Sequence, residues 1–186
     1  VDIFVGRNYV LSVRNRSNIG FLGVRERCER EPELLRHGAG FVLYALMDAV
    51  VDRYFPVIDA FELELEAIEE QIFQRGASRG NIERLYALKR RTGMLRHAAA
   101  PLLDVLGKLY GGRVPPVCAG VQEYFRDVHD HVTRISTTTD AVRDTIGIPG
   151  APDTVPAPSK LVNTGCFVSV AAGGEIDTRM DAGDHA

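Results

Sequence analysis

The sequence predicts an α+β protein that is predominantly helical: the remnant of an α/β sheet domain, then long antiparallel helices and a stalk-like helix. Three observations support this: two short β-prone runs near the start, three long segments with apolar residues every three or four positions, and a final stretch without a sustained period. We expect the α/β remnant over 1–38, the long helices over 39–146, and a divergent, disordered tail over 147–186.

Composition narrows the class of protein. The 186 residues carry 25 acidic and 22 basic side chains, a formal charge of −3, and are 45% hydrophobic. This balance argues against a nucleic-acid binder with a large basic surface and against wholesale disorder. Three widely spaced cysteines favour a reducing compartment over a disulfide framework. No apolar run approaches the ~20 residues of a spanning helix, and no signal peptide is visible.

The first element is a hairpin over 2–14, whose turn Gly6-Arg7-Asn8 has residues suited to a tight connection. A lone hairpin is marginal in water, so we expect the remaining strands of its sheet upstream of Val1. The chain therefore reads as cut from something longer. Asn18 is a candidate cap for a first helix over 19–28.

A long helix is predicted over 40–75, about 50 Å at 1.5 Å per residue. Pro56 should kink it, because proline removes a backbone hydrogen bond. Its apolar stripe recurs at helical spacing: Leu43, Met47, Val50, Tyr54, Ile58, Phe61, Leu65, Ile68 and Ile72. Beyond Pro56 its outer face is acidic, which is most simply a solvated face.

A turn over 76–80 leads to a second long helix over 81–110 with a basic outer face, and Pro101 should kink it. Opposite charges and a short turn predict an antiparallel pair with the helix over 40–75. A third helix starts near Val117 and ends at Ile146, where Gly147-Ile148-Pro149-Gly150 begins the tail.

The common catalytic motifs are absent, so we expect no enzyme: there is no GxSxG, P-loop, strand-linked GxGxxG or HExxH. The most informative cluster lies in the third helix, where Asp127, Asp130 and His131 share one face. These side chains could hold a divalent cation. Helix spacing alone favours the alternative that both aspartates pair with arginines across a helix interface.

Asp48 and Asp52 form a second pair, four residues apart and next to the apolar stripe of the first long helix. Buried carboxylates need partners, and Arg126 or Arg134 of the third helix could supply them. We interpret this pair as structural first and cation-related second.

Taken in order, these segments resemble the cytoplasmic part of the CorA-type magnesium and cobalt transporter family. The matching landmarks include residues 124–131 (Tyr-Phe-Arg-Asp-Val-His-Asp-His), with 3–11, 43–56, 63–73, 88–90 and 101–102. The resemblance implies an α/β domain, two long helices and a stalk entering the membrane. It also implies a pentamer in which magnesium between neighbouring cytoplasmic domains closes a central pore. Asp127 matches the stalk aspartate of that regulatory site.

The sequence departs from the family after Ile146, since neither membrane helix nor the Gly-Met-Asn loop follows. We therefore expect a cytoplasmic regulatory fragment without the pore, soluble by itself and tied to the membrane only through the parent's missing helices. Its expected metal ligands are Asp127, Asp130 and His131, for weak regulatory Mg²⁺ or Co²⁺. Its expected partners are further copies of itself and divalent cations, with no nucleic acid.

Three alternatives remain open at this stage. The first is the zinc-transporting branch of the same superfamily, because cytoplasmic helices do not reveal ion choice. The second is a helical scaffold or oligomerisation module without a metal role. The third, ranked last, is a metal-dependent hydrolase, which would want paired Glu-x-x-His motifs that the sequence lacks.

Overall fold

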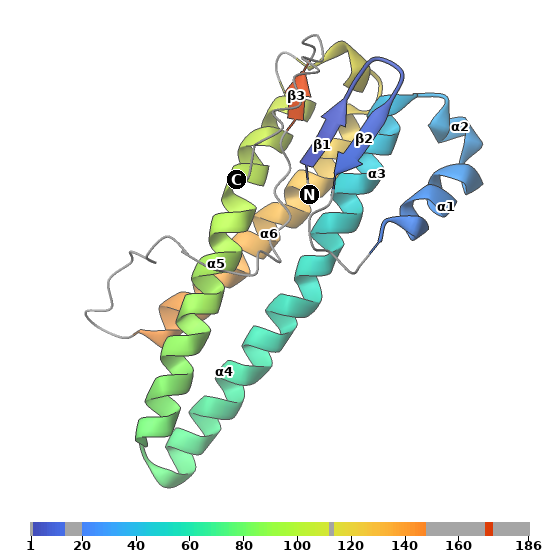
Figure 1. Cartoon of the computed structure of the whole chain (residues 1–186). Helices are drawn as coiled ribbons and strands as arrows, with labels where there is room; N and C mark the ends of the chain where they lie inside the picture. The colour runs from blue at the N-terminus through green and yellow to red at the C-terminus, as the bar shows by residue number, and fades with distance from the viewer. Residues whose placement is uncertain (1, 14–19, 112–113, 148–169, 173–186) are drawn as a thin grey trace, which may run out of the picture.

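The computed structural model describes residues 2–13, 20–111, 114–147 and 170–172, and Figure 1 shows their arrangement. It is mostly helical with a small sheet, which confirms the predicted fold class. In chain order the elements are β1 (Asp2–Val5), β2 (Val10–Val13), α1 (Leu22–Arg30), α2 (Pro32–Leu35), α3 (Ala39–Val51), the 3₁₀ turn η1 (Asp52–Tyr54), α4 (Phe55–Arg75), α5 (Arg79–Tyr110), the 3₁₀ turn η2 (Pro116–Cys118), α6 (Gln122–Ile146) and β3 (Val170–Ala172).

The sheet has the order β2-β1-β3, with β1 and β2 antiparallel and β1 and β3 parallel. The hairpin forms as predicted, and Gly6 N–H donates to the Tyr9 carbonyl at 2.9 Å across its turn. Side chains alternate along β1, so Ile3 is buried and Phe4, opposite Leu11 on β2, is exposed. One face of the sheet therefore packs on the helices and the other carries exposed apolar side chains.

The tail predicted over 147–186 lies mostly outside the described residues. Its described segment, Val170–Ala172, pairs with β1 in the register Phe4 to Ala171. The predicted cap Asn18 is also outside the described residues. The first helix is described from Leu22, two residues beyond the described start at Gly20, and Phe21 is its N-cap.

The segment predicted as one kinked helix is two helices, α3 and α4, joined by η1. Pro56, at the start of α4, has no N–H to donate to the carbonyl four residues earlier, and its ring would crowd that carbonyl. The chain therefore tightens into a 3₁₀ turn just before the proline. The break falls in the turn before Pro56, where the sequence predicted the lost hydrogen bond.

The predicted antiparallel pair of long helices is confirmed by α4 and α5, which lie side by side in Figure 1. Gly76 takes a φ of 76° at the end of α4, and the Ser78 hydroxyl accepts from the Asn81 N–H to cap α5. Charge complementarity contributes at one partly buried place, where Arg91 pairs with Glu64.

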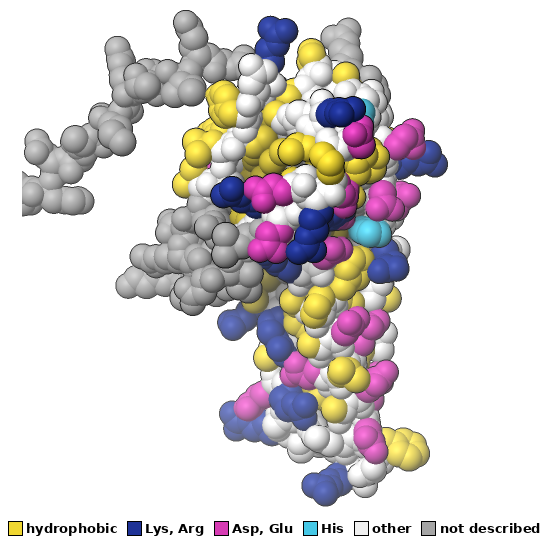
Figure 2. All heavy atoms as spheres, turned by 90° about the vertical axis from the view of Figure 1, so that its right-hand side faces the viewer, with side chains coloured by type: hydrophobic (Ala, Val, Ile, Leu, Met, Phe, Trp, Pro, Cys, Tyr) yellow, Lys and Arg dark blue, Asp and Glu magenta, His cyan; other side chains and the backbone are white. Residues whose placement is uncertain are grey.

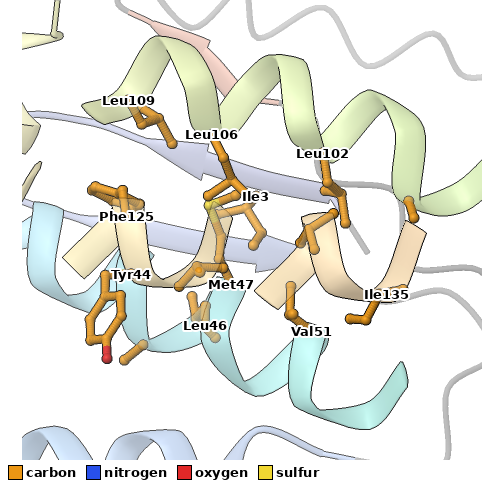
Figure 3. Close-up of a cluster of buried hydrophobic side chains, with 14 of the residues drawn as sticks. Ile3, Tyr44, Leu46, Met47, Val51, Leu102, Leu106, Leu109, Phe125 and Ile135 are labelled. Atoms are coloured by element: carbon orange, nitrogen blue, oxygen red, sulfur yellow. The ribbon is translucent and has the colours of Figure 1, made fainter. Parts of the chain in front are cut away.

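The core lies where α6 packs against α5 and α3, beneath β1 (Figure 3). Residues of α6 are buried at every third or fourth position, among them Phe125 and Ile135, and they meet Leu106 of α5 and Met47 of α3. At the start of α3, Gly40 lies so close to η2 that an added Cβ would be 2.3 Å from the Val117 carbonyl oxygen. Close packing at this end fixes how α3 crosses α6.

Candidate metal centre

The last turn of α3, the first residue of η1 and the middle of α6 meet at a polar cluster. Asp48, Asp52 and His131 each offer one ligand atom, and these atoms all lie within 4.8 Å of one another. Asp48 and Asp52 come together because they are one helical turn apart. The crossing of α3 and α6 brings the imidazole to them, so the cluster joins residues that are far apart in sequence.

Asp48 is the buried member, with 6% of its surface exposed. Its Oδ2 accepts from Arg27 Nη1 of α1 at 2.5 Å, and Arg27 Nη2 donates to the Tyr44 hydroxyl at 3.0 Å. The same guanidinium lies over the Tyr44 ring, 5.4 Å from its centroid. The hydrogen bond to Asp48 raises the pKa of Arg27, so this side chain stays charged. The predicted partners Arg126 and Arg134 were wrong, because α1 rather than α6 supplies the arginine.

The pKa of Asp52 depends on the other charges of the cluster. Loss of hydration raises the pKa of its carboxyl group, the charge of Asp48 raises it further, and Asp127 adds to this effect. His131 and Arg27 act in the opposite direction. Lost hydration and the nearby carboxylates therefore both disfavour the ionised form of Asp52.

His131 is partly buried and lies edge-on to Phe55, with 5.7 Å between ring centroids. Its Nδ1 is buried and has no hydrogen-bond partner in the part of the chain that the structure describes. A buried ring nitrogen without a partner is costly, so a ligand that accepted its lone pair would stabilise the site.

The three metal ligands predicted from the sequence, Asp127, Asp130 and His131, do not form one cluster in the structure. His131 belongs to the cluster. Asp127, one turn before it on α6, is exposed, makes no ion pair with another described residue, and acts electrostatically on Asp52 and Tyr44. Asp130 points elsewhere: its carboxylate is 71% exposed and lies 3.7 Å from His129 Nδ1.

Sequence reasoning found both halves of this cluster but did not join them. The two signals were a pair of residues four apart in the first long helix and another in the third. The spacing within one helix does not predict which other helix crosses it, or at which residues the two helices meet.

The donor set fits a divalent cation. Carboxylate oxygens suit Mg²⁺, which keeps several waters and binds through one or two carboxylates. An added imidazole suits Co²⁺ and other transition metals. The two carboxylates and the imidazole, with ligand atoms within 4.8 Å of one another, therefore form a place where such an ion would be stabilised.

Among the described residues, none of the helices combines the length and apolar character needed to cross a membrane. The long helices are instead amphipathic, and Figure 2 shows acidic and basic side chains mingled with hydrophobic ones along their exposed face.

The amino-acid sequence was compared with those of known proteins. The chain is 33% identical over 147 residues to the cobalt/magnesium transport protein CorA of Thermotoga maritima, covering 78% of this chain and 42% of that protein. It is 30% identical over 145 residues to the putative metal ion transporter YfjQ of Bacillus subtilis, covering 77% and 45% respectively. The chain thus spans less than half the length of these relatives. Residues 1–148 match the family described as CorA-like Mg²⁺ transporter protein, and the chain belongs to that family.

Proposed function

We propose that this chain is the cytoplasmic, cation-sensing part of a CorA-like divalent-cation transporter, with Mg²⁺ or Co²⁺ as its regulatory ion. The observation that carries the proposal is the cluster of Asp48, Asp52 and His131, whose ligand atoms come within 4.8 Å. Family membership supports the transport context, and the names of both relatives refer to metal ions.

The residues of the cluster each have a distinct role in the proposed site. Asp48 and Asp52 supply oxygen ligands, and a cation between them offsets the repulsion that raises the pKa of Asp52. His131 offers a ring nitrogen within 4.8 Å of the carboxylate oxygens. Because Asp48 and Asp52 lie at the end of α3 and His131 on α6, an ion held by all three ties these elements together.

Asp127 extends the proposed site outward. It is exposed on α6 beside the cluster, so it can contribute to an ion shared with a neighbouring copy of the protein. A pentamer with regulatory ions at its subunit interfaces is the assembly we propose for the intact transporter. In this chain alone, a site completed only by its own residues should be weak, roughly millimolar or poorer.

A stability titration tests the proposal. An ion that binds the folded state raises stability as its concentration passes its dissociation constant. We expect MgCl₂ and CoCl₂, raised from zero to tens of millimolar at constant ionic strength, to raise the melting temperature of the wild type. Asp52→Asn and His131→Gln should lose most of this response, and Asp127→Asn part of it.

Asp59→Asn is the matched control, because Asp59 is an exposed aspartate on α4 away from the cluster. The scaffold alternative predicts that all variants respond alike, and that result would refute the proposed site. A response to ZnCl₂ at far lower concentration than to MgCl₂ or CoCl₂ would favour the zinc-transporting alternative.

A further inference from the structure

The buried carboxylate of Asp48 has a counter-charge inside the protein. Arg27 Nη1 lies 2.5 Å from Asp48 Oδ2, and the same guanidinium bonds the Tyr44 hydroxyl. Since Asp48 is nearly inaccessible, its carboxylate would be a costly buried charge without a cationic partner. Arg27 meets that need in the described structure.

Arg27 differs from the other arginines of α1 in what it contacts. Arg25 pairs with Glu29, and Arg30 with Glu26, both exposed pairs within the helix. Arg27 reaches across to α3, so it is a charged link between α1 and the helix that carries the cluster. Its side chain keeps 37% exposure against 9% for that of Asp48. Water can therefore take up the guanidinium if it leaves, whereas the carboxylate has no such exit.

A divalent ion and the Arg27 guanidinium would both draw on the charge of Asp48. A divalent ion held by Asp48, Asp52 and His131 would lie close to the guanidinium, and like charges at such separations repel appreciably even with partial screening. The ion carries the larger charge and engages two carboxylates together. Arg27 hydrogen-bonds one carboxylate and one hydroxyl, and its Nε lies 3.9 Å from the more exposed Glu31 carboxylate.

We propose that Arg27 and a divalent cation are alternative counter-charges for Asp48, so that cation binding displaces Arg27 and loosens α1 from α3. This inference rests on the proposed cation site. Its first consequence is that Arg27 lowers the affinity of the site, because the ion must displace a bound guanidinium. Its second is that occupancy of the site is transmitted to α1, which connects the cluster to the sheet-bearing start of the chain.

The test compares two substitutions that remove the same charge from the same helix. Arg27→Gln removes the competitor, and Arg25→Gln removes an exposed arginine two residues away. The apparent dissociation constant for MgCl₂ is measured from melting temperature at constant ionic strength. We expect Arg27→Gln to bind Mg²⁺ about three- to tenfold more tightly than wild type, and Arg25→Gln to stay within about twofold.

Other outcomes of this titration would refute the inference. If Arg27→Gln matches Arg25→Gln, or binds Mg²⁺ more weakly than wild type, the competition is refuted and Arg27 instead orients Asp48. If wild type responds to Mg²⁺ and Asp52→Asn does not, the proposed site survives this failure. If no protein of the set responds to Mg²⁺, the site and the inference fall together.

A second measurement does not depend on folding of the Arg27 variant. Amide hydrogen exchange in α1 of the wild type should speed up when MgCl₂ is added, because the link to α3 is lost. The same addition should leave α1 of Asp52→Asn unchanged. Equal or slower exchange in wild-type α1 at saturating Mg²⁺ would overturn the inference.

Discussion

Asp52 has a carboxyl group whose surroundings favour the neutral form. Loss of hydration is the main cause of its raised pKa, and the neighbouring Asp48 adds to it. The folded state therefore binds this proton more tightly than the unfolded state does. Stability contributed by Asp52 is present at pH values below its ordinary pKa of 3.8 and is lost as the pH rises through the folded value.

Asp52→Asn should accordingly be more stable than wild type at pH 7 without divalent cations, since it removes an unfavourable charge. The difference should shrink as the pH falls below the ordinary aspartate range. Urea unfolding in EDTA at several pH values measures this, with Asp59→Asn as the control. A variant less stable than wild type at pH 7 would contradict it. Saturating Mg²⁺ should reverse the order, because the bound ion stabilises only the ionised carboxylate.

Gly40 shows how one position sets the approach of two elements. A Cβ at this site would lie 2.3 Å from the backbone oxygen of Val117, and a backbone atom cannot rotate out of the way. We expect Gly40→Ala to destabilise the fold by about 1–3 kcal/mol through overpacking. Gly23→Ala in α1 is the control: nothing lies within 4 Å of its added Cβ, so it should stabilise by about 0.5–1 kcal/mol. Chemical denaturation of both variants checks the contrast, and equal effects would refute the packing argument.

At the scale of elements, periodicity predicted what depends on one segment alone. The stripes of apolar residues located α3, α4 and α5 to within two residues, and Gly6-Arg7-Asn8 located the hairpin turn. The third helix, predicted from Val117, begins only at Gln122, because η2 takes up its expected start. Contacts between segments were harder to predict from the sequence. The partner of Asp48 is Arg27 and not an arginine of α6, because helical spacing orders residues around one axis without fixing which helix lies opposite. For the same reason, His131 was predicted with Asp127 and Asp130 rather than with Asp48 and Asp52.

Pro56 had a local effect that the sequence predicted. The hydrogen bond that a proline cannot make is lost in the preceding turn, and that turn becomes η1. Asp52 opens η1, but it keeps right-handed helical backbone angles and its N–H still donates to the Asp48 carbonyl. The irregular turn therefore leaves Asp52 one helical turn from Asp48.

At the scale of the whole molecule, the outer face of the small sheet is an apolar surface. Phe4 and Leu11 stand opposite one another across β1 and β2. Four apolar side chains of this hairpin keep between 43% and 54% exposure: Phe4, Tyr9, Leu11 and Val13. The helices cover the other face of β1, where Ile3 and Val5 are buried. Exposed apolar groups of this kind favour association with another surface, including that of a second copy.

We therefore expect the chain by itself to form weak, heterogeneous oligomers, with the sheet face contributing to the contact. Sedimentation should show an average mass that rises with protein concentration. The double variant Phe4→Ser, Leu11→Ser should reduce this association, because it removes an opposed apolar pair from the surface while leaving Ile3 and Val5 in the core. Leu63→Ser is the matched control, since Leu63 is 66% exposed and belongs to α4, a helix that runs away from the sheet in Figure 1. Two outcomes would contradict the expectation: a wild type that stays monomeric at high concentration, or a Leu63 variant that loses association as fully as the sheet variant. Because the contact is apolar, it should also persist in high salt, whereas association through the charged faces of α4 and α5 would weaken.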